Sequence, residues 1–403
     1  MFFRTLLPFC VLTALAAAEP LTSETAVRLA LENHPQLEAA RTLIAEAEAR
    51  ASGLGRLPNP ELETELALGR QERGRIEIGL SQSFPRASRL RGERHVAQES
   101  IQLARYEVAF AELTAAARVR LAVVELATAQ AELELAEHQA ALARELARAQ
   151  SSQASSGQLS SLDAAQAELV AREAELAVAI PRAARAAAAL ALSTALGREA
   201  DPTLSVSYTL TLPPEEAAVP PPGPCGEIAI AEAKLAAADA EITLARLQGR
   251  EDFRLGVFVE GEQERSDLGG REHEAMLGLR FSVPLPVRNV SAPLVAEKQA
   301  ARRRVALERE AQLLKVRNDL AANEAEVRAR YVSAAAIAKE LLPAAKAHLA
   351  ATEAAFARGE AEMSQVFRAR ERLAEIERSD LSARHAYHLA ATRRVSSACC
   401  LQF

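Results

Sequence analysis

In the stretch "GLSQSFPRASRLRGE" (residues 79–93) a strand-like run stops at a proline and a helix-like run follows. Proline has no backbone N–H and cannot continue the hydrogen bonding of a central strand, so strand pairing is expected to end at Pro85. The same corner occurs again in "GLRFSVPLPVRNVSAPLVAEK" (residues 278–298), at Pro284 and Pro286. Two copies of one strand-to-helix corner predict a duplicated architecture.

Four segments beside these corners alternate between apolar and polar side chains: residues 61–69, 75–84, 252–261 and 273–283. Each has about ten residues with one apolar and one polar face, which is typical of strands in outer-membrane barrels. They form two hairpins. The first strand alternates Leu62, Thr64, Leu66 and Leu68 with Glu61, Glu63 and Glu65. These glutamates would face a barrel interior, where they either give the lumen a negative potential or are simply solvated.

The rest of the chain is predicted to be mostly helical. It contains no Trp, only 4% aromatic residues and an excess of Ala, Leu, Glu and Arg, which is typical of long helices with a narrow apolar stripe. Long helices are expected over residues 90–150 and 294–357, the second with a kink at Pro343. Shorter helices return over residues 160–197 and to residue 395. A helix of about 60 residues would be roughly 90 Å long.

The two halves of the chain follow one plan of helix, hairpin, long helix, turn and shorter helix. The segment 227–248 resembles the segment 36–55, and a hairpin and a proline corner follow each. We therefore expect a first repeat over residues 19–211 and a second over 227–403. Residues 212–226 between them are too rich in proline for a helix or an inner strand and are expected to be a linker. The predicted fold class is mainly α with a small β part.

The N-terminal residues 1–18 have the pattern of an export signal, with Arg4, a short apolar stretch and three small residues at Ala16–Ala18. No uninterrupted run of about 18 apolar residues follows, so no membrane-spanning helix is expected. The net charge is −6, with acids and bases interleaved, which excludes the concentrated basic patch of a nucleic-acid surface. The sequence predicts an exported protein that enters a membrane only as strands.

Four strands cannot close a membrane barrel, because an open sheet would leave unpaired backbone groups in lipid. Other copies of the chain would have to complete the sheet, two copies giving eight strands and three copies twelve. The long helices would then continue away from the barrel as a tube. Two alternatives belong to other classes. An exported coiled-coil structural protein would lack the alternating strands, and a periplasmic adaptor would carry one helical hairpin between lipoyl-like halves.

No catalytic constellation is present, and we expect neither an enzyme nor a cofactor. His34, before a proline, and His138, in a helix, are interpreted as capping or packing residues. His385 and His388 have an i, i+3 spacing that could hold a metal, but no carboxylate or thiol stands at a suitable spacing, so no metal site is predicted.

Three further stretches carry a resemblance to a known family. The first is "LALENHPQLEAARTLIAEAEARASGLGRLPNPELETEL" (residues 29–66), with Asn33-His34-Pro35, Leu37 and Leu57-Pro58-Asn59-Pro60 as its most characteristic residues. The others are the turns "SGQLSSLDAAQAEL" (156–169) and "RGEAEMSQVFRARERL" (358–373). Together with the corners, in this order and duplicated, they resemble the TolC-like outer-membrane efflux proteins over essentially the whole mature chain. The first helix is particularly similar to the branch that serves heavy-metal and cation efflux.

The resemblance implies a homotrimer with a twelve-stranded barrel in the outer membrane and a long α-helical tunnel in the periplasm. It also implies a passive exit duct, served by an inner-membrane pump of the resistance-nodulation-division, ABC or major-facilitator type and by a periplasmic adaptor. The helical tips of this family form the periplasmic entrance and meet the adaptor. The matching positions here are Gly157, Leu159, Ser160, Leu162, Gly359, Ala361, Glu362 and Ser364.

The entrance itself departs from the family pattern. Well-studied relatives carry acidic residues just after the second tip turn, which form rings that constrict the tunnel and attract cations. The matching positions here are Gln365 and Arg368. We therefore predict a weaker cation preference and a closed state held by pairs of Arg368 with Glu371 or Glu362. The alternative is that Arg368 points outward to a neighbouring helix.

Three cysteines follow the export signal: Cys225, Cys399 and Cys400. Adjacent cysteines can bond each other only in a strained ring, so Cys225 is the better partner for either Cys399 or Cys400 in the oxidising periplasm. By family resemblance both regions lie near the equator of the tunnel, where such a bond would pin the C-terminus. The alternative is three unpaired thiols.

Overall fold

A computed structural model describes residues 20–68, 74–157, 160–214, 226–249, 252–265, 271–284 and 291–398. The chain divides into two compact units, each of which is described by itself. Unit 1 consists of Met1–Gln36, Leu113–Pro220 and Leu320–Ser396, and unit 2 consists of Leu37–Glu112, Pro221–Asp319 and Ser397–Phe403. The export signal predicted for residues 1–18 lies outside the described residues.

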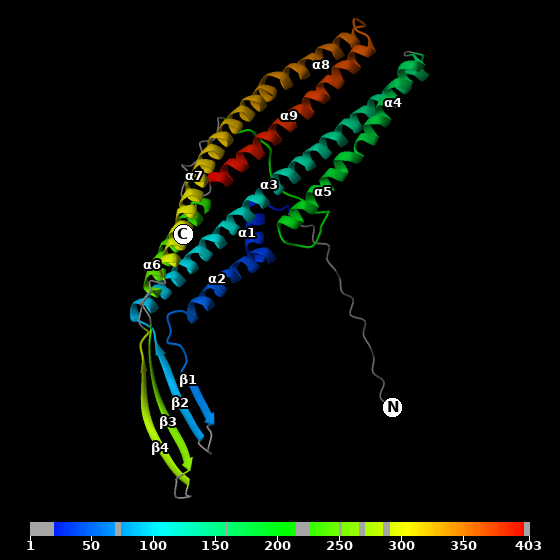
Figure 1. Ribbon diagram of the computed structural model, residues 1–403. Coiled ribbons are helices and arrows are strands. Elements are labelled where there is room, and N and C mark those ends of the chain that lie inside the picture. Colours follow the sequence, from blue (N-terminus) through cyan, green and yellow to red (C-terminus); the bar gives the residue numbers. More distant parts are fainter. Residues whose placement is uncertain are drawn as a thin grey trace, which may run out of the picture. The chain divides into compact units, whose positions relative to one another are not determined.

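Unit 2 contains a four-stranded antiparallel sheet (Figure 1) with the strands β1 (Glu61–Leu68), β2 (Gly74–Phe84), β3 (Phe253–Arg265) and β4 (Arg271–Ser282). Their order in the sheet is β1-β2-β3-β4, so the two hairpins meet through β2 and β3, with Ile78 opposite Val259. β3 and β4 run further toward their shared turn than the sequence pattern predicts, because pairing continues to Arg265 opposite Arg271. The strands at the edges are β1 and β4.

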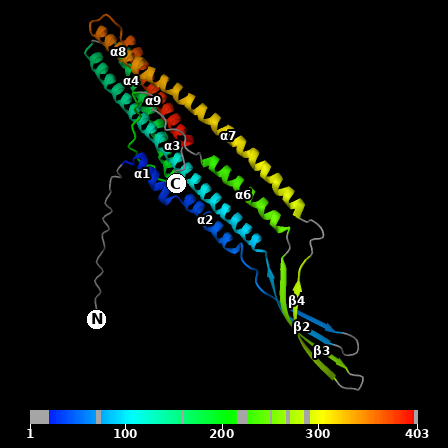
Figure 2. The ribbon, with the colours of Figure 1, turned by 90° about the vertical axis from the view of Figure 1, so that its left-hand side faces the viewer.

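The helices of unit 2 are α2 (Pro35–Gly53), α6 (Gly226–Gln248) and the first parts of α3 (Ala87–Ser155) and α7 (Ser291–Ala336). Figure 2 shows α6 beside the first part of α7. Ion pairs join these helices: Arg41–Glu112 at 2.7 Å, Lys298–Glu241 at 2.9 Å, Arg302–Asp239 at 2.9 Å and Arg309–Glu232 at 2.8 Å. The acid–base interleaving in the sequence thus serves partly to attach neighbouring helices and not only to solvate them.

The hydrophobic core of unit 1 joins α1 (Ser23–Asn33), the middle of α3 and α5 (Ala179–Ala195). Leu126, Leu192 and Leu196 are completely buried there. Small residues surround them, namely Ala26, Ala30, Val119, Ala122, Val123, Ala127 and Ala189. The remaining elements of unit 1 are α4 (Ser161–Ala177), α8 (Leu342–Ala357) and α9 (Met363–Ala398), with α8 and α9 side by side in Figures 1 and 2. Small side chains let the helices approach closely, which explains the alanine content of the chain.

Residues 201–214, which we call the strap, run along the helices of unit 1 without forming a helix or a regular strand. Arg185 donates hydrogen bonds to the carbonyls of Pro202, Thr203 and Leu204 at 2.8, 3.1 and 2.9 Å. Further along, the Tyr331 hydroxyl donates to the carbonyls of Pro213 and Pro214 at 3.2 and 3.0 Å. The predicted linker over 212–226 therefore begins with fastened residues, and its last residue, Gly226, already belongs to α6. The intervening residues 215–225 lie outside the described part.

Prolines interrupt two of the helices. Helix α4 ends at Ala177 and α5 begins at Ala179, because the ring of Pro181 clashes with the carbonyl four residues earlier. Before Pro343 the chain forms one turn of π-helix over Ile337–Leu341. This wider turn lets the helix continue although Pro343 has no backbone N–H to donate. A kink is expected from the sequence at Pro343, and the structure locates the irregularity in the turn before it.

One helical segment, Ser161–Ala195, is long and apolar enough by composition to cross a membrane. No such helix is expected from the sequence, because that expectation requires an uninterrupted apolar run, and Arg182 and Arg185 interrupt the apolar residues of this segment. Length and composition are the only grounds for this assignment. Since α5 contributes Leu192 to the core of unit 1, packing within the unit accounts for part of its apolar content.

Candidate functional site: the sheet, the corners and the helical tips

The sheet has one face that is apolar and exposed. A single row across the four strands consists of Leu62, Leu80, Val257 and Leu279, which are direct cross-strand partners. These side chains are exposed by 71, 50, 47 and 78%. The neighbouring rows contribute Leu66, Leu68, Ile76, Ile78, Leu255, Val259 and Leu277, which are exposed as well. A contiguous apolar surface of this extent marks contact with a lipid or protein environment.

Three phenylalanines end this apolar face on the side of the helices. The rings of Phe84 and Phe253 stack with centroids 5.3 Å apart, and Phe281 lies 6.2 Å from Phe253. Aromatic rings gather at membrane–water interfaces, where they border the apolar band of an outer-membrane sheet. These three rings therefore mark the level at which an apolar environment would end and the helices begin.

The first strand-to-helix corner is built around Pro85, which follows the last residue of β2. Arg89, one turn into α3, pairs with Asp252 at 2.7 Å and with Glu93 at 3.1 Å, and Asp252 directly precedes β3. The corner thus connects the start of α3 to the second hairpin. At the second corner Pro284 stands two residues after the end of β4, and Pro286 lies outside the described residues.

The first helical tip turns at Gly157, whose φ of +73° is a left-handed conformation that favours glycine. Ser160 then caps α4, its hydroxyl accepting a hydrogen bond from the backbone N–H of Leu162 at 3.2 Å. The Leu162 side chain is 73% exposed at this tip. Leu159, also predicted to contact an adaptor, lies outside the described residues.

The second tip turns at Gly359, with φ of +77°. Glu362 directly precedes α9 and accepts hydrogen bonds from the Ser364 hydroxyl at 3.3 Å and, through its carbonyl, from the Gln365 backbone N–H at 3.0 Å. Ala361 before it is half-buried. Glu362 therefore acts at the start of a helix, where a carboxylate is favourable.

The two residues predicted at the entrance, Gln365 and Arg368, are exposed on the first turns of α9. Arg368 forms no ion pair with any described residue of its own chain, so the pairs with Glu371 or Glu362 are not made within one subunit. The neighbouring Arg370 does form one, with Glu353 on α8 at 2.6 Å.

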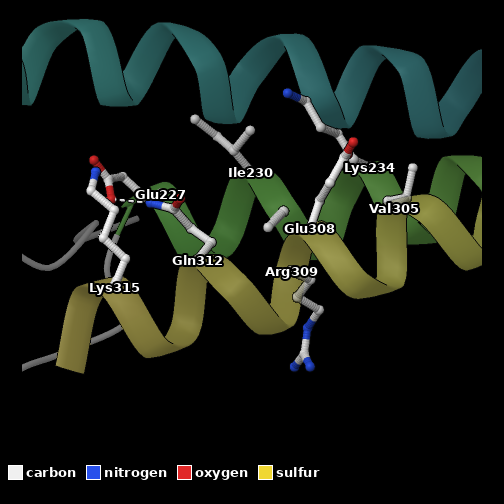
Figure 3. A pocket seen from close by; sticks show the side chains of 9 residues that line it. Glu227, Ile230, Lys234, Val305, Glu308, Arg309, Gln312 and Lys315 are labelled. Carbon is white, nitrogen blue, oxygen red and sulfur yellow. Dashed lines mark hydrogen bonds between the residues drawn. The ribbon is translucent and has the colours of Figure 1, made fainter. Parts of the chain in front are cut away.

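A groove of about 340 Å³ lies between α6 and α7 (Figure 3). Glu227 and Gln312 are hydrogen-bonded across it, Lys234 points toward α3, and Arg309 points away from it to pair with Glu232. Its lining mixes both charge signs with Ile230 and Val305 and includes no His or Cys. The groove lacks the converging acid, base or nucleophile that a reaction would need.

No group of three or more His, Cys, Asp or Glu side chains in the described residues could hold a metal ion. His34 accepts a hydrogen bond from the Gln36 backbone N–H at 3.2 Å and thus acts as a local cap. His388 is buried, and its Nδ1 lies 3.0 Å from the Tyr208 hydroxyl of the strap. Burial lowers the pKa of His388. A hydrogen bond with the backbone of Thr211 partly opposes this shift, and the nearby Arg384 and His385 lower the pKa further. The predicted partners Cys225, Cys399 and Cys400 lie outside the described residues.

The chain was compared with known proteins. Residues 26–198 match the family described as outer membrane efflux protein. No curated protein matches the chain. Among solved structures, CusC shares the fold with a TM-score of 0.75 at 15% identity, over 94% of this chain and 92% of that one. VceC of Vibrio cholerae, an outer membrane protein, gives 0.72 at 15% identity over 93% and 95%. The MtrE outer membrane channel of Neisseria gonorrhoeae gives 0.70 at 17% identity over 93% and 88%.

The family match covers residues 26–198, and the shared fold extends over more than nine-tenths of the chain. Together they confirm the resemblance to TolC-like outer-membrane efflux proteins that the quoted motifs predict. The similarity to the branch for heavy-metal and cation efflux stays a prediction.

Two arrangements in the structure are not predicted by sequence analysis. The strap is held by side chains far away in sequence, and no local pattern indicates this. The polar face of the sheet carries a network in which Arg280 of β4 reaches Glu63 of β1 and Glu77 of β2. Period-two alternation shows that these residues share a face, but it does not show which of them touch.

Proposed function

We propose that the chain is the exit duct of a tripartite efflux system, passively conducting substrates that an inner-membrane pump and a periplasmic adaptor deliver. The observation that carries the proposal is the four-stranded sheet with an exposed apolar face and two edges, β1 and β4. In lipid an unpaired sheet edge is costly, so the sheet has to be completed by further strands. Three copies would supply twelve strands, as the family resemblance implies, and a duct would run along the polar faces.

The tips are the proposed meeting place with the adaptor. Their two turns leave open space at Gly157 and Gly359, where an added Cβ would have nothing within 4 Å. The exposed Leu162 supplies an apolar contact beside the first turn. We expect the pump to be of the resistance-nodulation-division, ABC or major-facilitator type, and outer-membrane lipid to surround the sheet.

At the entrance we propose that Arg368 faces the tunnel and finds its partner, Glu371 or Glu362, in the assembled trimer. Its exposure and the lack of an ion pair within the described chain leave the guanidinium available for such a contact. Three copies would place three arginines in a narrow passage, where like charges act strongly on ions. The entrance would then have a weaker cation preference than one lined by carboxylate rings.

Membrane fractionation tests the function. The protein should stay with the outer membrane after washing and run as an SDS-resistant oligomer, whereas release by salt or carbonate would contradict the proposal. Purified protein in a planar bilayer should conduct ions, and Arg368→Ala should change conductance or ion preference. Arg172→Ala serves as the control, because Arg172 lies on α4 and its ion pair among the described residues is with Glu168 of its own helix, at 2.6 Å. An Arg368 variant that conducts like the control would place Arg368 outside the entrance.

A further inference from the structure

The polar face of the sheet carries more acids than bases. The register places on it Glu61, Glu63, Glu65, Glu77, Glu260, Glu262, Glu264, Glu272 and Glu274, together with Arg75, Arg254 and Arg280. All three arginines are engaged in ion pairs on this face. In a duct bordered by this face, the number of compensated carboxylates would set the sign and strength of the field on a passing ion.

Arg280 is the arginine that joins the most distant strands. Its Nη1 donates to Glu63 of β1 at 3.0 Å, and its Nη2 donates to Glu77 of β2. The Glu77 side chain is only 3% exposed, whereas Glu63 and Arg280 are 34% and 42% exposed. Arg280 therefore compensates one buried and one accessible carboxylate while its own guanidinium remains in contact with the space above the sheet.

The Arg280 side chain packs on the ring of Phe258, which lies between two glycines of the neighbouring strands. Phe258 of β3 stands directly between Gly79 and Gly278 in the register, and its ring lies over Gly278, where a Cβ would be 2.3 Å from the ring. The Arg280 guanidinium carbon lies 5.0 Å from the centre of the same ring, within the range of a cation–π contact. Ring and carboxylates together fix the position of the charge.

The other two arginines are attached differently. Arg254 is 46% exposed and reaches Glu61 and Glu63 only at 3.6 and 3.5 Å. Arg75 lies nearer the hairpin turn and pairs with Glu260 at 2.9 Å and with Glu77 at 3.2 Å. Of the three, Arg280 alone combines two close carboxylate partners with an aromatic support among the described residues.

From this geometry we infer that Arg280 is a specificity-determining residue of the duct, which sets its ion preference by compensating Glu63 and Glu77 on the conducting face. The inference rests on the proposed function, because it requires that ions pass along the polar face of the sheet. It assigns part of the ion selectivity to the membrane-embedded sheet and not only to the periplasmic entrance. Small anions and cations would therefore be admitted more evenly than the carboxylates of this face alone would allow.

Reversal potentials in a KCl gradient across a planar bilayer test this inference. Among the described residues, Arg280→Gln leaves Glu63 with Ser81 and the weaker contact to Arg254 at 3.5 Å, so the reversal potential should shift toward that of K⁺. Adding Glu63→Gln to Arg280→Gln removes the uncompensated carboxylate and should return the potential toward the wild-type value. Arg280→Lys keeps the charge and should stay near wild type.

Outer-membrane yield and the SDS-resistant oligomer establish that each variant has assembled. A variant that fails to assemble is replaced by Glu63→Gln alone, for which the opposite shift, toward Cl⁻, is expected. A wild-type protein without conductance would refute the proposed function. A conducting wild type with unchanged reversal potentials in Arg280→Gln and in Glu63→Gln would overturn this inference and leave the proposed function intact.

Discussion

Replacement of Gly278 by alanine should destabilise the sheet, because the space for a side chain there is filled by Phe258. A Cβ on Gly278 would lie 2.3, 2.6 and 2.9 Å from three atoms of the ring, so the ring has to move. Insertion of a methyl group into a filled site costs about 1–3 kcal/mol. The lower entropy of the unfolded chain with alanine offsets about 0.4–1 kcal/mol of this cost. We expect a net loss of up to about 2.5 kcal/mol, with a central value of about 1.3 kcal/mol.

The measurement is urea unfolding from lipid vesicles, followed by circular dichroism because the chain contains no Trp. Protein concentration must be matched, since the stability of an oligomer depends on it. Gly261→Ala is the control in the same strand pair, because a Cβ there would meet its nearest atom at 3.5 Å, an ordinary contact. That variant should be unchanged or slightly stabilised.

A double-mutant cycle makes the test independent of general effects on the sheet. In a Phe258→Ala background the obstacle is absent, so Gly278→Ala should cost nothing there, which corresponds to a coupling energy of about 0.5–3 kcal/mol between the two sites. If Gly278→Ala costs as little as Gly261→Ala, or costs the same with and without Phe258, the ring does not lie over Gly278. The support proposed for Arg280 would then be wrong.

Two further predictions concern unit 1. Gly197→Ala should lower the free energy of unfolding by about 2–4 kcal/mol, because its φ of +69° strains alanine and the new Cβ would lie 2.8 Å from Pro35. Gly157→Ala has a similar φ but nothing within 4 Å, so it should cost only about 1–2 kcal/mol in the same circular-dichroism assay. Equal costs for the two variants would contradict the contact with Pro35. Stability should also decrease as the pH is lowered. The folded-state pKa of His388 lies below its ordinary value of 6.5, so below that pH the unfolded chain binds more protons than the folded chain. The contribution of His388 to stability is therefore fully present above about pH 6.5 and is lost as the pH falls toward the folded-state pKa. Thermal unfolding between pH 8 and pH 5 should therefore depend less on pH in His388→Gln, and an unchanged slope would show that His388 is not the group responsible.

The elements of the fold could be predicted from the sequence wherever the signal is local. Period-two alternation located the four hairpin strands, and Pro85 ended β2 because a missing N–H acts on its own neighbours. The turns at Gly157 and Gly359 lie in the two tip stretches quoted for the family resemblance, and in both the glycine adopts the left-handed conformation that ends a helix. Prediction was less complete where a proline acts inside a helix. The position of Pro343 indicated a kink, but the chain accommodated it as a π-turn before the proline.

The contacts that form the candidate site could not be predicted, because their partners are far apart in the chain. Arg280 and Glu63 are separated by 217 residues, and Arg185 fastens a strap that composition alone describes as irregular. Alternation assigns Arg280, Glu63 and Glu77 to one face, but the choice of partner depends on the order and register of the strands. The register and the absence of side chains at Gly79 and Gly278 allow Arg280 of β4 to reach Glu63 of β1.

Ion pairs join the two hairpins in both directions. The first hairpin contributes Glu61, Glu63 and Glu77, which pair with Arg254 and Arg280 of the second. In the opposite sense, Arg75 of the first hairpin pairs with Glu260 of the second at 2.9 Å. Glu77 and Glu260 stand directly opposite each other across β2 and β3, where two like charges are unfavourable. Arg75 contacts both carboxylates, and Arg280 also pairs with Glu77, so arginines from both hairpins offset the repulsion at the place where the hairpins meet.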